Sequence, residues 1–177
     1  MPLFVITITT TDTTPELLIA SSYVRDLNIY LDLIWQRYFA DVPRANDVQI
    51  AYCRPWKSRL GLIRMSLDNA ISFIGINMLL KHKDVPEDVL VATIAHELVH
   101  YAHGFGSPLP RLYEHPHANN VVDKELERRN LGEQLRICNE WIDEQWYSFY
   151  QAQREAGCIP GMRRPVRGPG SRQQRAG

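Results

Sequence analysis

Five consecutive residues, His96-Glu97-Leu98-Val99-His100, combine residue types and a spacing that suit metal chemistry. On an α-helix, residues four apart lie one turn above each other on the same face, so both imidazoles can reach one metal ion. Glu97 follows the first histidine and can hold a water molecule bound to that metal. This HExxH pattern predicts the core of a zinc peptidase, with His96 and His100 as ligands.

The residues around this motif predict that it lies on a buried helix. Asp84 and Glu87 have the spacing of a capping box, and Pro86 suits a first helical turn. Residues 89–95 are almost entirely apolar, which favours a central helix, and Gly104 suits its end. Two histidines and a glutamate on such a helix are costly unless they are paired or bind a metal. The context therefore favours a metal site over a chance match.

Length and composition predict a single domain with a substantial core, because the chain has 177 residues of which 45% are hydrophobic. Lys+Arg and Asp+Glu number 20 each, so net charge gives no argument for nucleic acid, a membrane or acidic substrates. The N-terminus has no basic region typical of a signal peptide, and no apolar run approaches the ~20 residues of a membrane span. The three cysteines, which fit a reducing compartment, are Cys53, Cys138 and Cys158. We expect a cytoplasmic protein without a membrane partner.

The end of the chain differs in composition from the rest. After Cys158 there are five arginines and no acidic residue, among many Pro, Gly and Gln residues. Such a segment cannot bury a core. The sequence therefore predicts a domain over residues 1–158 and a disordered tail over residues 159–177.

Hydrophobic patterns predict an α+β fold with a small sheet of three or four strands. Residues 3–10 are rich in β-branched residues, and residues 48–52 alternate between apolar and polar or small side chains. Residues 60–66 and 71–76 are further predicted strands. Glycines in them that indicate a bulge or close backbone approach are Gly61 and Gly75.

Helices are predicted both before and after these strands along the chain. A long N-terminal helix is expected to begin near Thr13 and Glu16, which have capping-box spacing, and to extend to Tyr38. A short helix over residues 77–83 leads into the HExxH helix. Residues 118–129 and a long segment ending at Gly157 are predicted to form the C-terminal helices.

Residues 26–150 resemble the SprT-like zinc metallopeptidases. The shared order is a long helix, a small strand cluster containing residues 60–66, the HExxH helix, and a further histidine that opens the next helix. The resemblance implies a small zincin-like domain in which three histidines bind Zn²⁺. It also implies that Glu97 is the general base on a zinc-bound water, so that the protein hydrolyses peptide bonds of a protein or peptide substrate.

The family includes peptidases that cut proteins crosslinked to DNA. This chain lacks the paired-cysteine zinc ribbon found at the C-terminus of some members. A DNA partner is therefore supported only by the Arg-rich tail, whose charges could contact phosphates.

The third zinc ligand has two candidates, His115 and His117. In the family, the third histidine typically stands just before a helix, with a bulky apolar residue four positions later. His117 followed by Val121 fits this spacing and is preferred. His115 remains the alternative, because it lies nearer to the motif and Pro116 could open the helix. Glu125 is a weaker candidate, expected instead to be solvated or salt-bridged.

Four further features have less specific interpretations. His103 is predicted to interact with free carbonyls at the end of the HExxH helix. The charged run over residues 123–129 is predicted to be a solvated face. Tyr113 is a possible oxyanion stabiliser that no pattern supports. Residues 71–76 are a candidate strand for pairing with an extended peptide.

The alternative function is a non-catalytic, zinc-stabilised module that binds protein or DNA. A catalytic zinc keeps one coordination position open beside three protein ligands, whereas a structural zinc has four. A fourth ligand, such as His115 together with His117, would indicate the structural site. Hydrolysis of a non-peptide amide is a third possibility.

Overall fold

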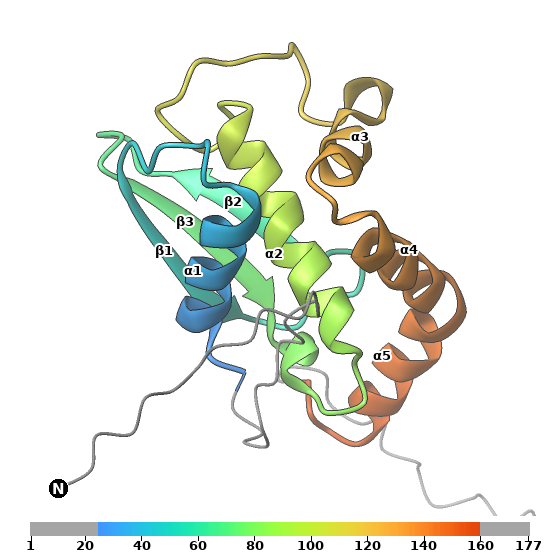
Figure 1. Ribbon diagram of the computed structural model, residues 1–177. Helices are drawn as coiled ribbons and strands as arrows, with labels where there is room; N and C mark the ends of the chain where they lie inside the picture. Colours follow the sequence, from blue (N-terminus) through green and yellow to red (C-terminus); the bar gives the residue numbers. More distant parts are fainter. Residues whose placement is uncertain (1–24, 160–177) are drawn as a thin grey trace, which may run out of the picture.

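The computed structural model describes residues 25–159, which form a small sheet and a set of helices around one central helix (Figure 1). The predicted strand over residues 3–10 and the predicted helix start at Thr13 lie outside the described residues, as does the tail from residue 160 onward. Ile159, which the sequence assigned to the tail, is 6% exposed and belongs to the hydrophobic core.

The described sheet has three strands, β1 (Asp47–Cys53), β2 (Gly61–Met65) and β3 (Ile71–Asn77), in the order β1-β3-β2. β1 pairs parallel with β3, and β2 pairs antiparallel with it. The predicted α+β class and small sheet are confirmed. β3 is the central strand, so β2 forms one edge of the sheet, and this placement matters for the site.

In the described part of the chain, helix α1 spans Leu27–Tyr38. The Asp26 carboxylate accepts a hydrogen bond from the backbone N–H of Asn28 at 2.9 Å, which caps the start of the helix. One face of α1 is buried, and the helix contacts α2 and β1. The buried residues on this face are Leu27, Tyr30, Leu31, Ile34 and Trp35.

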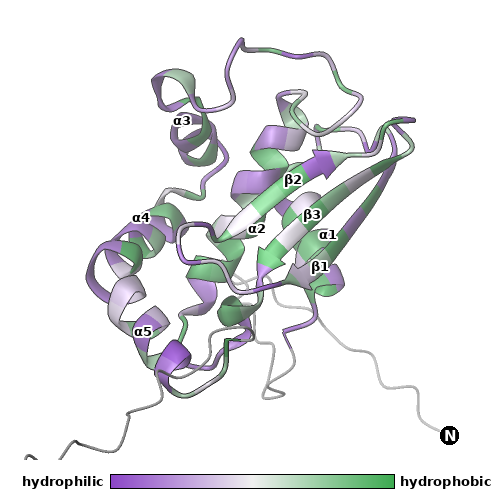
Figure 2. Cartoon of the chain, turned by 180° about the vertical axis from the view of Figure 1, so that it is seen from behind, coloured by the Kyte–Doolittle hydropathy of each residue, from purple (hydrophilic) through white to green (hydrophobic). Residues whose placement is uncertain are grey.

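Helix α2 (Glu87–Ala102) carries the HExxH motif and lies between the sheet on one side and α3 and α4 on the other (Figure 1). Eleven of its residues are buried, as its apolar composition predicted. Figure 2 shows hydrophobic residues along β2 and β3, the strands that contact this helix.

The predicted capping box at the start of α2 is wrong. Pro86 occupies the N-cap and no side chain caps the helix. The Glu87 carboxylate accepts a hydrogen bond from the Tyr30 hydroxyl at 2.7 Å, so it is committed to α1 instead of the α2 backbone. Asp84 lies in the preceding loop, where its backbone N–H donates to Nδ1 of His82 at 3.2 Å.

The remaining elements follow the predicted order with two changes. η1 (Met78–Lys81) is a 3₁₀ turn, and the predicted 118–129 helix is split into η2 (Ala118–Asn120) and α3 (Val121–Arg128). The split arises because Asn119 and Asn120 have positive φ angles of 54° and 56°, which no α-helix accommodates. The long C-terminal segment consists of α4 (Gly132–Trp141), a π-helical turn (Ile142–Trp146) and α5 (Tyr147–Glu155).

Within the described part of the chain, no helix combines the length and the apolarity that crossing a lipid bilayer requires.

Candidate metal centre

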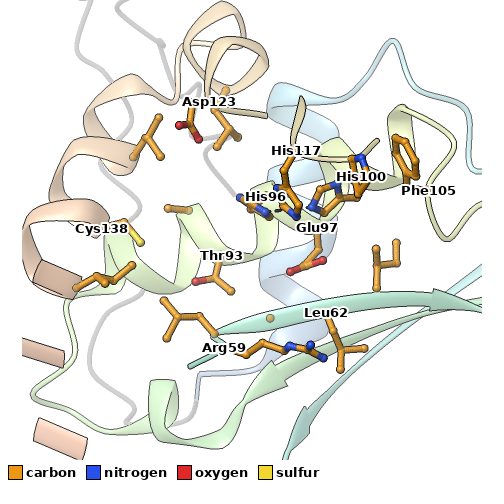
Figure 3. Close-up of a pocket in the computed structure, with 18 of the residues that line it drawn as sticks. Arg59, Leu62, Thr93, His96, Glu97, His100, Phe105, His117, Asp123 and Cys138 are labelled. Carbon is orange, nitrogen blue, oxygen red and sulfur yellow. Dashed lines mark hydrogen bonds between the residues drawn. The ribbon is translucent and has the colours of Figure 1, made fainter. Parts of the chain in front are cut away.

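Helix α2 brings His96 and His100 together on one face, as their spacing predicted. Their Nε2 atoms lie 3.1 Å apart, and their ring centroids are 4.7 Å apart. Figure 3 shows both rings close together beside His117, with Glu97 beneath them. One turn of helix therefore supplies two converging nitrogen ligands and an adjacent carboxyl group.

His117 completes this group from the loop that precedes η2. Its ring centroid lies 4.6 Å from that of His100 and 5.4 Å from that of His96. One ligand atom from each of the three histidines lies within 4.8 Å of the others. His115 is directed elsewhere, since its side chain is 74% exposed and lies 3.8 Å from the Glu114 carboxylate. We call His96, His100 and His117 the histidine cluster.

The loop reaches the cluster because its start is held against the end of α2. The N–H of Phe105 donates to the carbonyl of His100 at 2.8 Å, and the N–H of Leu112 donates to the carbonyl of His103 at 3.1 Å. Gly104 adopts a φ of +77°, and a Cβ there would lie 2.5 Å from the Pro110 carbonyl oxygen. The sharp turn after α2 therefore requires a glycine.

The histidine cluster can hold a metal ion. Burial lowers the pKa of His96 to about 4, with a smaller contribution from His117. Burial, followed by the neighbouring histidines, lowers the pKa of His100 to about 3. Neutral imidazoles keep the lone pair that a metal needs. Two nitrogens at ~2.0–2.1 Å from a tetrahedral zinc are ~3.3 Å apart, close to the spacing between His96 and His100.

Glu97 lies between the cluster and the first residue of β2. It is 5% exposed, and burial raises the pKa of its carboxyl to about 8, while Arg59 opposes this shift. A Cβ at Gly61 would stand 2.6 Å from Oε1 of Glu97. The predicted close approach at Gly61 is thus confirmed, and its partner is the motif glutamate. Gly75 likewise approaches Cys53, with 2.7 Å between its hypothetical Cβ and Sγ.

A pocket of about 600 Å³ opens over the cluster (Figure 3). One wall is α2 and another is β2 with the residues before it. The far end is formed by α3 and α4, and the near end by the loop at Phe105 and Gly106. The charged residues in its lining are Arg59, Glu97 and Asp123.

The strand beside this pocket is β2, so the prediction that residues 71–76 pair with a peptide is wrong. β3 is hydrogen-bonded on both sides and offers no free edge. In β2, the carbonyl of Leu60 accepts from Asn77 at 2.7 Å and the N–H of Ser66 donates to Ile71 at 2.8 Å. Because such bonds alternate along an antiparallel strand, the backbone groups of Gly61 and Ile63 point to the open edge.

Three other candidates lie outside the pocket lining. Glu125 accepts hydrogen bonds from Arg128 and Arg129, in line with the predicted salt bridge. The Tyr113 ring packs on His103 with centroids 4.8 Å apart. His103 is the C-cap of α2, but its Nδ1 is buried without a hydrogen-bond partner among the described residues, so the predicted bond to a carbonyl is not formed there.

The predicted solvated face over residues 123–129 is wrong for Asp123, for Arg129 and for Glu125, whose side chain is 15% exposed. Arg129 is 8% exposed, and Asp123 lines the pocket. Asp123 and Leu126 are three residues apart and share a helix face. This separation of an acidic residue from an apolar one was a weak signal in the sequence that Asp123 faces the interior. Arg59 precedes β2 in a loop, and no sequence pattern indicated its place in the pocket lining.

The arrangement can bind a metal through neutral imidazoles and place one carboxyl group beside it. No protein-family model matches this chain, and no curated protein has detectable sequence similarity to it.

Proposed function

We propose that the protein is a zinc-dependent peptidase of the SprT-like kind, with Glu97 as the general base. The observation that carries this proposal is the position of Glu97, buried beside three converging imidazoles and facing an open pocket. The HExxH spacing and the third histidine supply the donor set of a catalytic zinc site.

His96, His100 and His117 would hold the ion. When bound, zinc would lower the pKa of a water molecule and polarise the carbonyl group of the substrate. Glu97 accepts the proton of the attacking water and delivers it to the nitrogen of the departing amine. The carboxyl lies next to the β2 backbone at Gly61, where a Cβ would stand 2.6 Å from Oε1, so the glycine leaves space for the carboxyl beside the cluster.

The edge of β2 is the proposed binding site for the substrate backbone. Gly61 and Ile63 line the pocket, and within the described residues no strand pairs with their free edge. An extended peptide can add to such an edge through main-chain hydrogen bonds. This geometry favours a peptide over a small non-peptide amide, because a small molecule could not form hydrogen bonds along several residues of the strand.

The non-catalytic alternative has less support. A structural zinc site requires four protein ligands. In residues 25–159, the metal-competent group consists of three histidines, and His115 is exposed on the far side of Pro116. Binding of DNA by the Arg-rich tail stays a prediction.

The decisive experiment compares Glu97→Gln with Glu114→Gln, a change to an exposed carboxylate two residues before Pro116. Both variants should retain zinc in the same ratio to protein as the wild type. Cleavage of casein should fall at least about a hundredfold in Glu97→Gln, because the general base is lost. Glu114→Gln should cleave like the wild type.

A chelator should abolish cleavage by the wild type, and added zinc should restore it. Equal rates for wild type and Glu97→Gln would refute the assigned base. A zinc-loaded wild type that cleaves no protein or peptide would instead support the binding module.

A further inference from the structure

The pocket extends beyond the histidine cluster into a space between α2, α3 and α4. In Figure 3, Asp123 and Cys138 border this space on one side of His96, and Phe105 lies on the opposite side of the histidine cluster. We call this space the α3–α4 chamber. Its apolar walls are formed by Ala92, Leu126, Leu135, Cys138 and Ile142.

Asp123 is the carboxylate that lines this chamber. It is half-buried, and it has no hydrogen bond or ion pair among residues 25–159. The arginines on and after the same helix are already committed, since Arg128 binds Glu125 and Arg129 binds both Glu125 and Asp41. A carboxylate that is partly withdrawn from water without a partner favours a cation from outside.

The chamber combines this negative charge with an apolar wall. Lysine and arginine bury an aliphatic stem while keeping a charged end beside a polar group. An acidic side chain would be repelled by Asp123, and a purely apolar one would leave the carboxylate unpaired. The chamber therefore matches the chemistry of a basic side chain.

The direction of β2 indicates which substrate residue reaches the chamber. β2 begins at the chamber end, where Gly61 adjoins Thr93 and Glu97, and Ile63 adjoins Gly106 at the other end. A peptide that pairs antiparallel with β2 runs the opposite way, with its C-terminal part toward Gly61. The residue after the cleaved bond then lies at the chamber.

We propose that Asp123 selects lysine or arginine at the position immediately after the bond that is cleaved. This inference rests on the proposed peptidase function. The apolar walls of the α3–α4 chamber hold the aliphatic stem, and the Asp123 carboxylate accepts hydrogen bonds from the charged end. Asp123 is thus a specificity-determining residue, whereas Glu97 performs the proton transfers.

The first test measures binding without cleavage. Fluorescent peptides with lysine, norleucine or glutamate at one position are titrated against the zinc-loaded Glu97→Gln protein. Norleucine matches the lysine stem and lacks its charge. The lysine peptide should bind about tenfold more tightly than the norleucine peptide, and the glutamate peptide should bind most weakly.

Adding Asp123→Asn should remove the difference between lysine and norleucine, and Asp123→Lys should favour glutamate. Asp143→Asn, which removes an exposed carboxylate outside the pocket lining, is the matched control and should keep the preference. Asp123 also lies in the first turn of α3, where an acid favours the helix dipole. That structural role alone would change the melting temperature and leave the ratio of affinities unchanged.

The second test maps the cut sites of the wild type and of Asp123→Asn in an unfolded protein by mass spectrometry. Wild type should cut before lysine and arginine, and Asp123→Asn should lose this preference. Equal binding of lysine and norleucine, cleavage after basic residues, or an unchanged preference in Asp123→Asn would overturn the inference. Absence of zinc-dependent cleavage by the wild type would contradict the peptidase function, while the binding test would still decide the role of Asp123.

Discussion

Helix α3 is flanked by two polar groups, Arg129 with its partners and the histidine cluster, which differ in how their hydrogen-bonding atoms are satisfied. Arg129 follows the helix and donates to the Tyr38 carbonyl at 2.6 Å, to both oxygens of Asp41 at 2.6 and 2.9 Å, and to Glu125 at 2.7 Å. Its guanidinium also lies over the Phe39 ring, 4.3 Å from the centroid. We call this group the Arg129 clamp.

The histidine cluster precedes α3 and shows the opposite pattern. Its nitrogens face one another, and Nδ1 of His100 is buried without a partner among the described residues. Polar groups that are fully hydrogen-bonded stabilise a fold, whereas three imidazoles that converge on one another, one of them with a buried unpaired nitrogen, require another explanation. The clamp therefore fits a structural role, and the cluster fits a ligand-binding one.

The largest expected effect is on zinc affinity, and it tests whether His117 or His115 belongs to the histidine cluster. His117→Ala should weaken zinc binding by more than about a hundredfold, because a direct ligand should matter at least as much as a residue that supports one. His115→Ala should bind zinc like the wild type. Titration against a competing chelator measures both affinities. Loss of zinc from His115→Ala with retention by His117→Ala would reverse the assignment.

The second prediction tests the structural role of the Arg129 clamp. Arg129→Met keeps an unbranched stem but removes every clamp hydrogen bond, so the zinc-free protein should lose about 2–4 kcal/mol of unfolding free energy. Urea denaturation measures this change. Arg136→Met is the matched control, since Arg136 also pairs with two glutamates but is exposed on α4, and it should leave stability unchanged. Similar losses of unfolding free energy in the two variants would show that the buried clamp stabilises the fold no more than the exposed ion pairs of Arg136.

The smallest expected effects come from two glycines of the sheet, one of which should affect cleavage and the other stability. Gly61→Ala should lower the rate of peptide cleavage about tenfold, because its Cβ would displace the carboxyl group of Glu97. The fold should tolerate this change, since the displaced atom ends a flexible side chain. Gly75→Ala should cost about 1–3 kcal/mol, as its Cβ would meet Cys53 on the neighbouring strand.

Cleavage rates per folded molecule and urea denaturation curves test both glycine variants. Gly75→Ala should cleave at the wild-type rate once corrected for the folded fraction. An unimpaired Gly61→Ala enzyme would show that the space at Gly61 is not needed to position the Glu97 carboxyl.

Local patterns predicted much of the fold. The alternation and apolar runs located all three described strands, and the apolar run before His96 predicted a buried α2. Boundaries were less predictable where a competing contact decided them. Glu87 bonds to Tyr30 instead of capping α2, and the two left-handed asparagines delay the start of α3. These outcomes depend on neighbours that are far apart in sequence or on rare backbone angles.

For the candidate site, the sequence by itself determined the pairing of His96 with His100, because a helix places residues four apart on one face whatever surrounds it. Three features required the tertiary structure: that His117 and not His115 joins them, that β2 and not β3 borders the pocket, and that Asp123 lines it. Each depends on how a loop, a strand order or a helix orientation brings distant residues together. Helical periodicity carries no information about such long-range packing.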